Sequence, residues 1–331
     1  MNDLKNKILA STKEDLDDIE IALKQNLKPY LDLVSQIASH ILFAGGKRLR
    51  PLLMVLSARI CGYKSNSDKT FSIMFEYLHA ATLLHDDLVD EATLRRGKPV
   101  AHSIWGNSIA VLVGDFLVAR ALSVATDTGH LNVIKIISEI TENMVQGEIH
   151  QLMRKGQPDL SEEEYMEIIQ NKTAILFKGA CQVSAVIADA REKEEKAISN
   201  YGFNFGIAFQ MIDDLLDYTS NAGILGKEAG ADLKEGKLTL PLIYALKQAD
   251  SKADSKDRAM MEKIIKNKDF SVGEFEILLE LLSKYKGLKY TEELAAKHIA
   301  RAKEALIGVF KPSETRETLI NIADYALARK Y

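Results

Sequence analysis

The sequence has few of the residues that interrupt or cross-link a chain. Among 331 residues there are 6 prolines, 19 glycines, one tryptophan and two cysteines, Cys61 and Cys181. Without a paired CxxC spacing, two cysteines indicate neither a disulfide framework nor a zinc site, which fits a reducing cytoplasm. The N-terminus lacks the apolar run of a signal peptide, and no later stretch looks long and uncharged enough to span a bilayer. We expect a cytoplasmic protein with at most peripheral membrane contact.

An excess of positive charge is also missing. The formal net charge is −4, which gives no reason to expect a nucleic-acid partner, because nucleic acid calls for a basic face. Hydrophobic residues make up 47% of the chain and charged residues 27%, a balance that allows a sizeable core. No shift in composition marks a linker, so we predict a single domain over residues 1–331.

What is present is helical periodicity, with apolar residues three and four apart between the scarce prolines and glycines. The pattern predicts an all-α bundle and no convincing strand. The segments Met74 to Leu88 and Phe203 to Leu216 are apolar around most of their circumference, as expected of central helices. The predicted helices cover residues 3–25, 30–43, 49–61, 68–91, 101–126, 131–155, 161–189, 191–220, 237–249, 256–267, 272–286, 289–310 and 314–329.

Two of these apolar segments carry the same acidic motif, DDxxD. In a helix the first and last acids of this motif lie on one face and repel each other. Crowded carboxylates in an apolar helix are costly unless a cation neutralises them. Mg²⁺ fits, because it prefers carboxylate oxygens and is usually completed by substrate phosphates. The acids are Asp86, Asp87 and Asp90 in the first motif and Asp213, Asp214 and Asp217 in the second.

A solvated acidic helix face is the simpler interpretation of one DDxxD alone. Here both motifs follow apolar residues and lead into basic loops, which favours a metal and diphosphate site. Arg95 and Arg96 follow the first motif, and Arg guanidinium groups match phosphate oxygens bidentately. The stretch from Gly223 to Pro241 follows the second motif and resembles a mobile basic loop, with Lys227, Lys234 and Lys237.

Further candidate phosphate ligands lie elsewhere in the chain. The segment Gly45 to Pro51 places three cations, Lys47, Arg48 and Arg50, before a helix start, a favourable position for an anion. Lys172 and Thr173 add a cation and a hydroxyl. For any one of these residues a solvated surface charge remains the alternative. His79 could donate to a phosphate or be a core histidine, whereas His85 and His102 look structural.

Together these motifs resemble the trans-isoprenyl diphosphate synthase family, also called polyprenyl synthetases. GGKRLRP, LLHDDLVDEATLRRG, NKTAILF, FQMIDDLLDY and GKEAGADLKEGKLTLP occur in the family's order, densely over about residues 40–245. Five ordered motifs make the match specific. Two positions depart from the family pattern, Leu238 within GKLTLP and His150 after GEI.

The resemblance implies a helical bundle around a deep central cavity, a homodimer, and two to three Mg²⁺ ions that bridge an allylic diphosphate to both aspartate motifs. It implies that the six aspartates bind metal, and that Asp86, Asp87, Asp90, Asp213, Asp214, Lys172 and Lys227 are catalytic. The isopentenyl diphosphate site would comprise Lys47, Arg50, His79 and Arg96. The allylic diphosphate site would comprise Arg95, Lys172, Thr173, Gln210, Lys227 and Lys237.

The expected reaction is head-to-tail addition of isopentenyl diphosphate to an allylic diphosphate. The family's product tunnel runs beneath the first motif, and bulky residues one turn before Asp86 stop the chain early. Ala81 and Thr82 are small and lie under that aspartate. Ordinary helix packing would also explain them. We therefore expect a long all-trans product of about C40, an octaprenyl chain for quinone side chains.

Other functions remain open from sequence alone. A farnesyl or geranylgeranyl diphosphate synthase would run the same reaction and stop sooner. A terpene cyclase shares the aspartate-rich magnesium site but would need no second diphosphate site, and a head-to-head synthase lacks these elongation motifs. A silent subunit of a heteromeric synthase would be expected to lose acids that this chain keeps.

Overall fold

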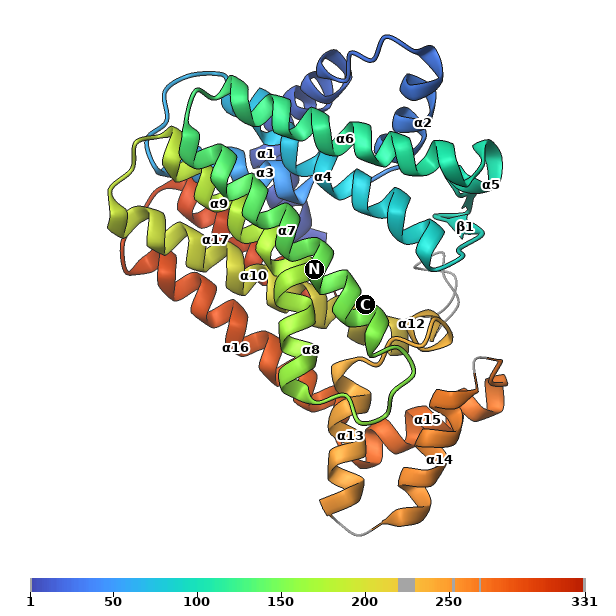
Figure 1. The fold of residues 1–331 in the computed structure, drawn as a ribbon. Helices are drawn as coiled ribbons and strands as arrows, with labels where there is room; N and C mark the ends of the chain where they lie inside the picture. The colour runs from blue at the N-terminus through green and yellow to red at the C-terminus, as the bar shows by residue number, and fades with distance from the viewer. Residues whose placement is uncertain (1, 220–229, 252–253, 268, 330–331) are drawn as a thin grey trace. The chain divides into compact units, whose positions relative to one another are not determined.

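The protein is almost entirely helical in the computed structural model, which describes residues 2–219, 230–251, 254–267 and 269–329 (Figure 1). Its helices are α1 (Asn2–Asn26), α2 (Asp32–Leu42), α3 (Leu49–Ile60), α4 (Asp68–Val89), α5 (Ala101–Trp105), α6 (Asn107–Asp127), α7 (Leu131–Met153), α8 (Glu162–Ile169), the π-helical segment η1 (Gln170–Ala174), α9 (Ile175–Ile187), α10 (Glu192–Thr219), α12 (Ala231–Lys234), α13 (Leu240–Ser251), α14 (Ser255–Lys266), α15 (Val272–Lys284), α16 (Gly287–Ile307) and α17 (Glu314–Ala328). This confirms the predicted all-α class.

The chain forms two compact units by its internal contacts. The first comprises residues 1–142, 176–202 and 304–322, and the second comprises residues 143–175, 203–303 and 323–331. Several helices, including α7, α10 and α16, contribute residues to both units.

Helix α4 is the central element of the first unit. It packs against α1, α2, α3, α5 and α6, and Figure 1 shows α6 lying alongside it. Met74, Phe75, Tyr77 and Ala81 are each 0% exposed, which confirms that this strongly apolar helix is a core element. The buried hydroxyl of Tyr77 donates to the carbonyl of Leu23 in α1 at 3.0 Å, so the core also satisfies its polar atom.

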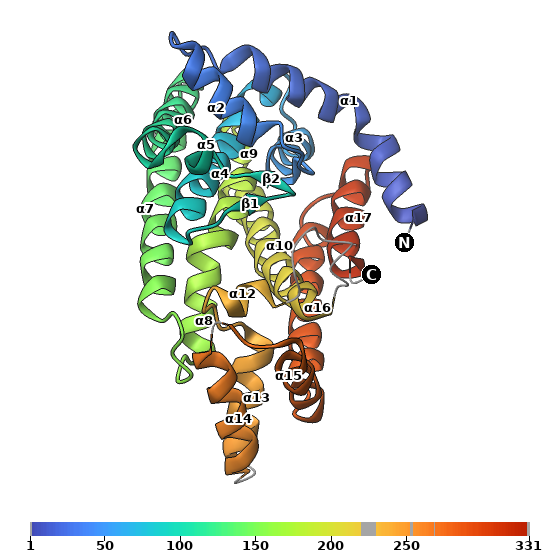
Figure 2. The same cartoon turned by 90° about the vertical axis from the view of Figure 1, so that its right-hand side faces the viewer.

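The second unit contains α8, η1 and α12 to α15, together with parts of α7, α10, α16 and α17. Helices α13, α14 and α15 pack together and are seen in Figure 2. Both α8 and α15 start at a capping box, Ser161 with Glu164 and Ser271 with Glu274, in which side chains satisfy two otherwise unpaired N–H groups. The rings of Tyr244 and Tyr290 stack at 3.9 Å, and the Tyr290 hydroxyl donates to Glu162.

The structure differs from the sequence prediction in two helices and in one hairpin that was not predicted. The helix predicted over residues 101–126 is broken at Gly106, whose φ of 85° favours glycine. The helix predicted over residues 161–189 is interrupted by η1. A short antiparallel hairpin, β1 (Leu94–Arg95) with β2 (Lys98–Pro99), was not predicted, because two-residue strands are too short to show a period; its arrows are visible in Figure 2.

Helix α6 is the fourth difference. Its 21 residues are long and apolar enough, by length and composition, to cross a membrane, contrary to the expectation from sequence. Only 39% of its apolar window is buried, on the side where it contacts α4, α2 and α5. Helices of this length and composition also occur in the cores of proteins that do not span a membrane.

Candidate diphosphate and metal site

The first unit contains a group of cations around His79 of α4. We call Lys47, Arg50, His79 and Arg96 the cation cluster. Loss of solvation, followed by the nearby guanidinium groups of Arg50, Arg95, Arg96 and Arg48, holds the pKa of His79 well below its ordinary value. The pKa of Arg96 is lowered by burial and then by Arg95. The structure therefore concentrates positive potential here, which an anion would relieve.

Glycines allow the loop before α3 to approach this cluster. A Cβ on Gly45 or Gly46 would lie 3.9 or 3.8 Å from Nη1 of Arg96, so the hairpin guanidinium reaches the loop backbone. Gly45 has a φ of 100°, which a side chain would strain. The guanidinium of Arg50 lies 4.6 Å from the ring centroid of Phe177, a cation–π contact that fixes its direction.

Arg48 behaves differently from the other cations of this loop. It is only 6% exposed and pairs with Glu20 at 2.5 Å and Glu76 at 2.6 Å. Its Nη2 also donates to the carbonyl of Leu42 at 2.6 Å. The structure corrects the interpretation of three equivalent cations, because the charge of Arg48 is already balanced inside the protein.

The first aspartate motif divides in a similar way. Asp87 is 3% exposed, and Arg95 binds it through Nε at 2.8 and 2.9 Å and through Nη2 at 2.7 Å. Asp86 and Asp90 are half-buried at the end of α4, one turn apart. Asp87 thus ties the hairpin to α4, and both its oxygens are engaged with the residue that was predicted to bind the allylic diphosphate.

The two residues predicted to control chain length lie on the same helix. Ala81 is 0% exposed, and the half-buried Thr82 donates its hydroxyl to the carbonyl of His79 at 2.8 Å. Both side chains are small, as the tunnel hypothesis requires, and their role in chain length stays a prediction.

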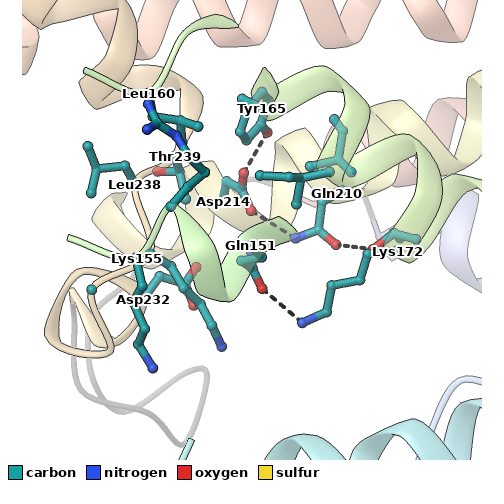
Figure 3. Close-up of a pocket in the computed structure, with 16 residues that line it drawn as sticks. Gln151, Lys155, Leu160, Tyr165, Lys172, Gln210, Asp214, Asp232, Leu238 and Thr239 are labelled. Carbon is teal, nitrogen blue, oxygen red and sulfur yellow. Dashed lines mark hydrogen bonds between the residues drawn. The ribbon is translucent and has the colours of Figure 1, made fainter. Parts of the chain in front are cut away.

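The second unit contains a cavity of about 110 Å³, seen in Figure 3. Its lining includes five residues predicted from sequence: Lys172, Thr173, Gln210 and Lys237 as diphosphate ligands and Asp214 as a metal ligand. The cavity also includes residues that were not predicted: Gln151, Arg154, Lys155, Tyr165 and Asp232.

A chain of hydrogen bonds connects the polar groups of this cavity (Figure 3). The hydroxyl of Thr173 donates to Oε1 of Gln210 at 2.9 Å, and Nε2 of Gln210 donates to Oδ1 of Asp214 at 2.8 Å. The buried hydroxyl of Tyr165 donates to Oδ2 of Asp214 at 2.6 Å. Each carboxylate oxygen therefore has a donor, which fixes the Asp214 side chain.

Lys172 lies in η1, where the wider π-helical turn changes the register between α8 and α9. Its Nζ donates to Oε1 of Gln151 at 2.9 Å and pairs with Glu148. A Cβ on Gly147 would lie 2.9 Å from the backbone nitrogen of Lys172, closer than such atoms approach. Gly147 thus allows α7 and η1 to bring the ammonium and its partners together.

The acids of the second motif have separate partners. Asp213 pairs with Arg329 at 2.5 Å. Asp217 accepts the backbone N–H groups of Ala231 at 3.1 Å and Asp232 at 3.2 Å. These two hydrogen bonds hold the first residues of α12, so the Asp217 carboxylate caps the start of that helix.

The donor set around Asp214 suits a divalent cation. Burial, then the charge of Asp232, raises the pKa of Asp214 to about 8, and the hydrogen bonds from Tyr165 and Gln210 oppose this rise. Within the described residues, no three His, Cys, Asp or Glu side chains converge on one point.

Lys237 and Lys227 belong to the basic loop predicted after the second motif. Lys237 lines the cavity and pairs with Glu235 at 2.7 Å. Its backbone N–H donates to the backbone carbonyl of Asp232 at 2.8 Å. Lys227 lies outside the described residues, as do residues 223–229 of the predicted basic loop. The part that is described forms α12 and the turn at Gly236.

Sequence reasoning missed Tyr165, Asp232 and Arg329. Asp232 stands in the quoted stretch GADLKEG, between glycines, and that position was a usable signal. Arg329 is 116 residues from Asp213, and Tyr165 is 49 residues from Asp214. No local spacing reveals such pairs.

Comparisons with known proteins agree with the geometry. Residues 31–282 match the polyprenyl synthetase family model. Octaprenyl diphosphate synthase of Escherichia coli (strain K12) is 39% identical over 98% of both chains. All-trans-nonaprenyl-diphosphate synthase (geranyl-diphosphate specific) of Rhodobacter capsulatus is 37% identical over 99% of this chain and 98% of that one.

Among solved structures, a polyprenyl synthase from Caulobacter crescentus CB15, complexed with calcium and isoprenyl diphosphate, aligns with a TM-score of 0.91. It is 37% identical, with 98% of each chain covered. A family match over more than half of the chain, near-complete coverage of relatives and an all-helical fold with cationic and acidic sites lead to one conclusion: this chain belongs to the polyprenyl synthetase family and is a prenyltransferase.

Proposed function

We propose that the protein elongates an allylic diphosphate by repeated head-to-tail addition of isopentenyl diphosphate. The observation that carries the proposal is the cation cluster, where the guanidinium of Arg96 lies against the loop at Gly45 and Gly46 and where burial, followed by the charges of neighbouring arginines, lowers the pKa values of His79 and Arg96. A site with this excess of positive charge suits a diphosphate. A terpene cyclase would need no such site in addition to an aspartate-rich one.

The allylic diphosphate would bind the other group of residues. We propose Arg95, Lys172, Thr173, Gln210, Lys227 and Lys237 as its ligands, and Asp86, Asp87, Asp90, Asp213, Asp214 and Asp217 as the acids of the metal site. Asp87, Asp214 and Asp217 already have partners for both oxygens, so their contribution includes holding Arg95, Gln210 and α12 in place.

The chemistry follows from charge and proximity. Two to three Mg²⁺ ions, when bound, would supply a Lewis acid that stabilises the departing diphosphate. Lys172 and Lys237 would stabilise the same negative charge as the allylic C–O bond breaks and its electron pair leaves with the diphosphate. The cation cluster would hold isopentenyl diphosphate so that its double bond forms the new C–C bond with the cation. Loss of a proton, to the released diphosphate, then restores an allylic product.

For the product we propose an all-trans chain of about C40 that serves quinone side chains. The small side chains of Ala81 and Thr82 support a long product, and relatives of this chain carry octaprenyl and nonaprenyl names. We further propose that one polyprenyl synthetase domain spans residues 1–331 and that the enzyme is a cytoplasmic homodimer.

A product assay tests this function directly. Purified protein would be incubated with Mg²⁺, isopentenyl diphosphate and, separately, dimethylallyl, geranyl, farnesyl and geranylgeranyl diphosphates, with chain length read by mass spectrometry. We expect polyprenyl diphosphates of about C40. EDTA should abolish them, and Asp86→Ala should lower the rate by roughly a hundredfold or more, because charge stabilisation in the transition state is lost.

Asp18→Ala is the matched control, since Asp18 is an exposed acid on α1, and it should keep the wild-type rate. Products that stop at C15 or C20 would keep the reaction and contradict the chain-length proposal. If no primer gives a linear product, a cyclase or a silent subunit would become the better interpretation.

A further inference from the structure

Arg48 adopts a backbone conformation that few non-glycine residues adopt. Its φ of 48° and ψ of 34° are left-handed, and it is the residue immediately before α3 (Leu49–Ile60). In this region a side chain is unfavourable unless the surroundings hold it there. Gly45 and Gly46 lie just upstream, so the loop could have accommodated a glycine at position 48 without strain. The arginine side chain must therefore supply something that offsets the strain.

The contacts of Arg48 show what it supplies. Nε donates to Glu20 of α1 at 2.5 Å, Nη1 donates to Glu76 of α4 at 2.6 Å, and Nη2 donates to the carbonyl of Leu42 in α2 at 2.6 Å. One guanidinium thus joins three helices to the start of a fourth. The fork of Arg allows this geometry, and a lysine could not reproduce it.

The same ion pairs lie beside the cation cluster. Lys47 directly precedes Arg48 and Arg50 follows it by two residues, so the backbone dihedrals of Arg48 determine how Lys47 is placed relative to the first turn of α3, which carries Arg50. Glu76 precedes His79 by one turn of α4, and its charge raises the pKa of Arg96 against the opposing effects of burial and Arg95. Glu76 therefore interacts with Arg48 through a hydrogen bond and with Arg96 through its charge.

We propose that Glu20, Arg48 and Glu76 form a positioning triad that presents the cation cluster to the diphosphate of isopentenyl diphosphate. Glu20 extends the machinery of this site into the N-terminal helix α1, which has no residue among the expected ligands. The triad does not touch the substrate, because its charges are paired with each other. The inference rests on the proposed function and adds to it the residues that set affinity at one of its two diphosphate sites.

The test separates positioning from stability. Glu20→Gln keeps the size of the side chain and removes its charge. Asp15→Asn is the matched control, because Asp15 also lies on α1 and also pairs with an arginine, Arg59 of α3, at 2.5 Å. Arg59 is at the opposite end of α3 from the loop. Both variants lose an ion pair between α1 and an arginine, Arg48 just before α3 or Arg59 near the end of α3, and only the loss at Arg48 should affect the site.

Three readouts are needed for the wild type and both variants: the Kd of isopentenyl diphosphate without metal, by calorimetry; the steady-state constants for both substrates; and the Tm. We expect Glu20→Gln to raise the Kd and KM of isopentenyl diphosphate about three- to tenfold, a loss typical of a displaced charge-assisted hydrogen bond. Its kcat and its KM for farnesyl diphosphate should stay within about twofold of wild type. Asp15→Asn should lower the Tm and leave every kinetic constant unchanged.

Glu76→Gln provides a second variant and should show the same selective loss. The inference is overturned if Glu20→Gln binds isopentenyl diphosphate like the wild type, or if Asp15→Asn raises its KM equally. If the wild-type protein itself neither binds nor consumes isopentenyl diphosphate, the proposed function fails, and that result is distinct from a wild-type enzyme whose Glu20→Gln variant is unaffected.

Discussion

Gly114 in α6 has no side chain because His85 occupies the space. An added Cβ would lie 2.2 Å from Nε2 of His85 and 2.7 Å from its Cδ2. The imidazole also lies 3.2 Å from the carbonyl oxygen of Val111. His85 is next to Asp86 in the chain, so its anchorage on α6 helps to fix the helix end that carries the first aspartate motif. This supports the interpretation of His85 as a structural residue.

Gly114→Ala should therefore destabilise the protein by about 1–3 kcal/mol, because a rigid ring on a well-packed helix must move. Gly273→Ala is the matched control, since Gly273 lies in α15 with no atom within 4 Å of the added Cβ. That change should stabilise the helix by roughly 0.5–1 kcal/mol. Urea unfolding of both variants would measure the difference, and equal stabilities would contradict the described packing of His85.

At the scale of elements, a hydrogen bond between His298 of α16 and Asn204 of α10 connects the two helices. The surroundings of His298 favour its neutral form. Nδ1 of His298 lies 2.9 Å from Oδ1 of Asn204, and the ring is 6% exposed. Burial, then the charge of Arg301, lowers the pKa of His298 to about 4. The unfolded chain would take up this proton at a pH nearer 6.5.

Between about pH 6.5 and pH 4 the unfolded state therefore binds more protons at this position than the folded state does, so stability falls as the pH falls through this window. We expect a loss of roughly 1–2 kcal/mol, reduced by solvent screening. His298→Asn should lose less stability than the wild type over the same window, as measured by urea unfolding at several pH values. Lys297→Gln, on the same helix, should keep the wild-type dependence. Parallel curves for wild type and His298→Asn would refute this expectation.

Helix existence was predictable and helix continuity was not. The three- and four-residue apolar spacing gave α1, α3, α4 and α10 close to their true bounds. The break at Gly106 depends on a positive φ, and η1 depends on how α7 approaches at Gly147. Both are set by tertiary packing, which a local pattern does not contain. The same limit applies to the site, where spacing identified the acids of α4 and α10 but not that Arg95 or Tyr165 would engage two of them.

At the scale of the whole molecule, the number of chains in the assembly can be tested. The mass of one chain is 36.8 kDa, and we propose a homodimer. Light scattering after size-exclusion chromatography should give about twice that mass across a tenfold range of concentration, because a dimer stays associated when its Kd lies well below the protein concentrations used. A mass of one chain at every concentration would contradict the proposal while leaving the chemistry of each site unchanged.

The enclosure of α4 also has a consequence in time. Amide hydrogens of a helix surrounded on most sides exchange with solvent only when the structure around them opens globally. Residues Met74 to Ala81 lie on such a helix, beside α1, α2, α3, α5 and α6. Their exchange should therefore be among the slowest in the first unit. The opening free energy calculated from their exchange rates should equal the free energy of global opening of that unit. Any anion that binds the cation cluster would slow this exchange further, even at amides that it never touches.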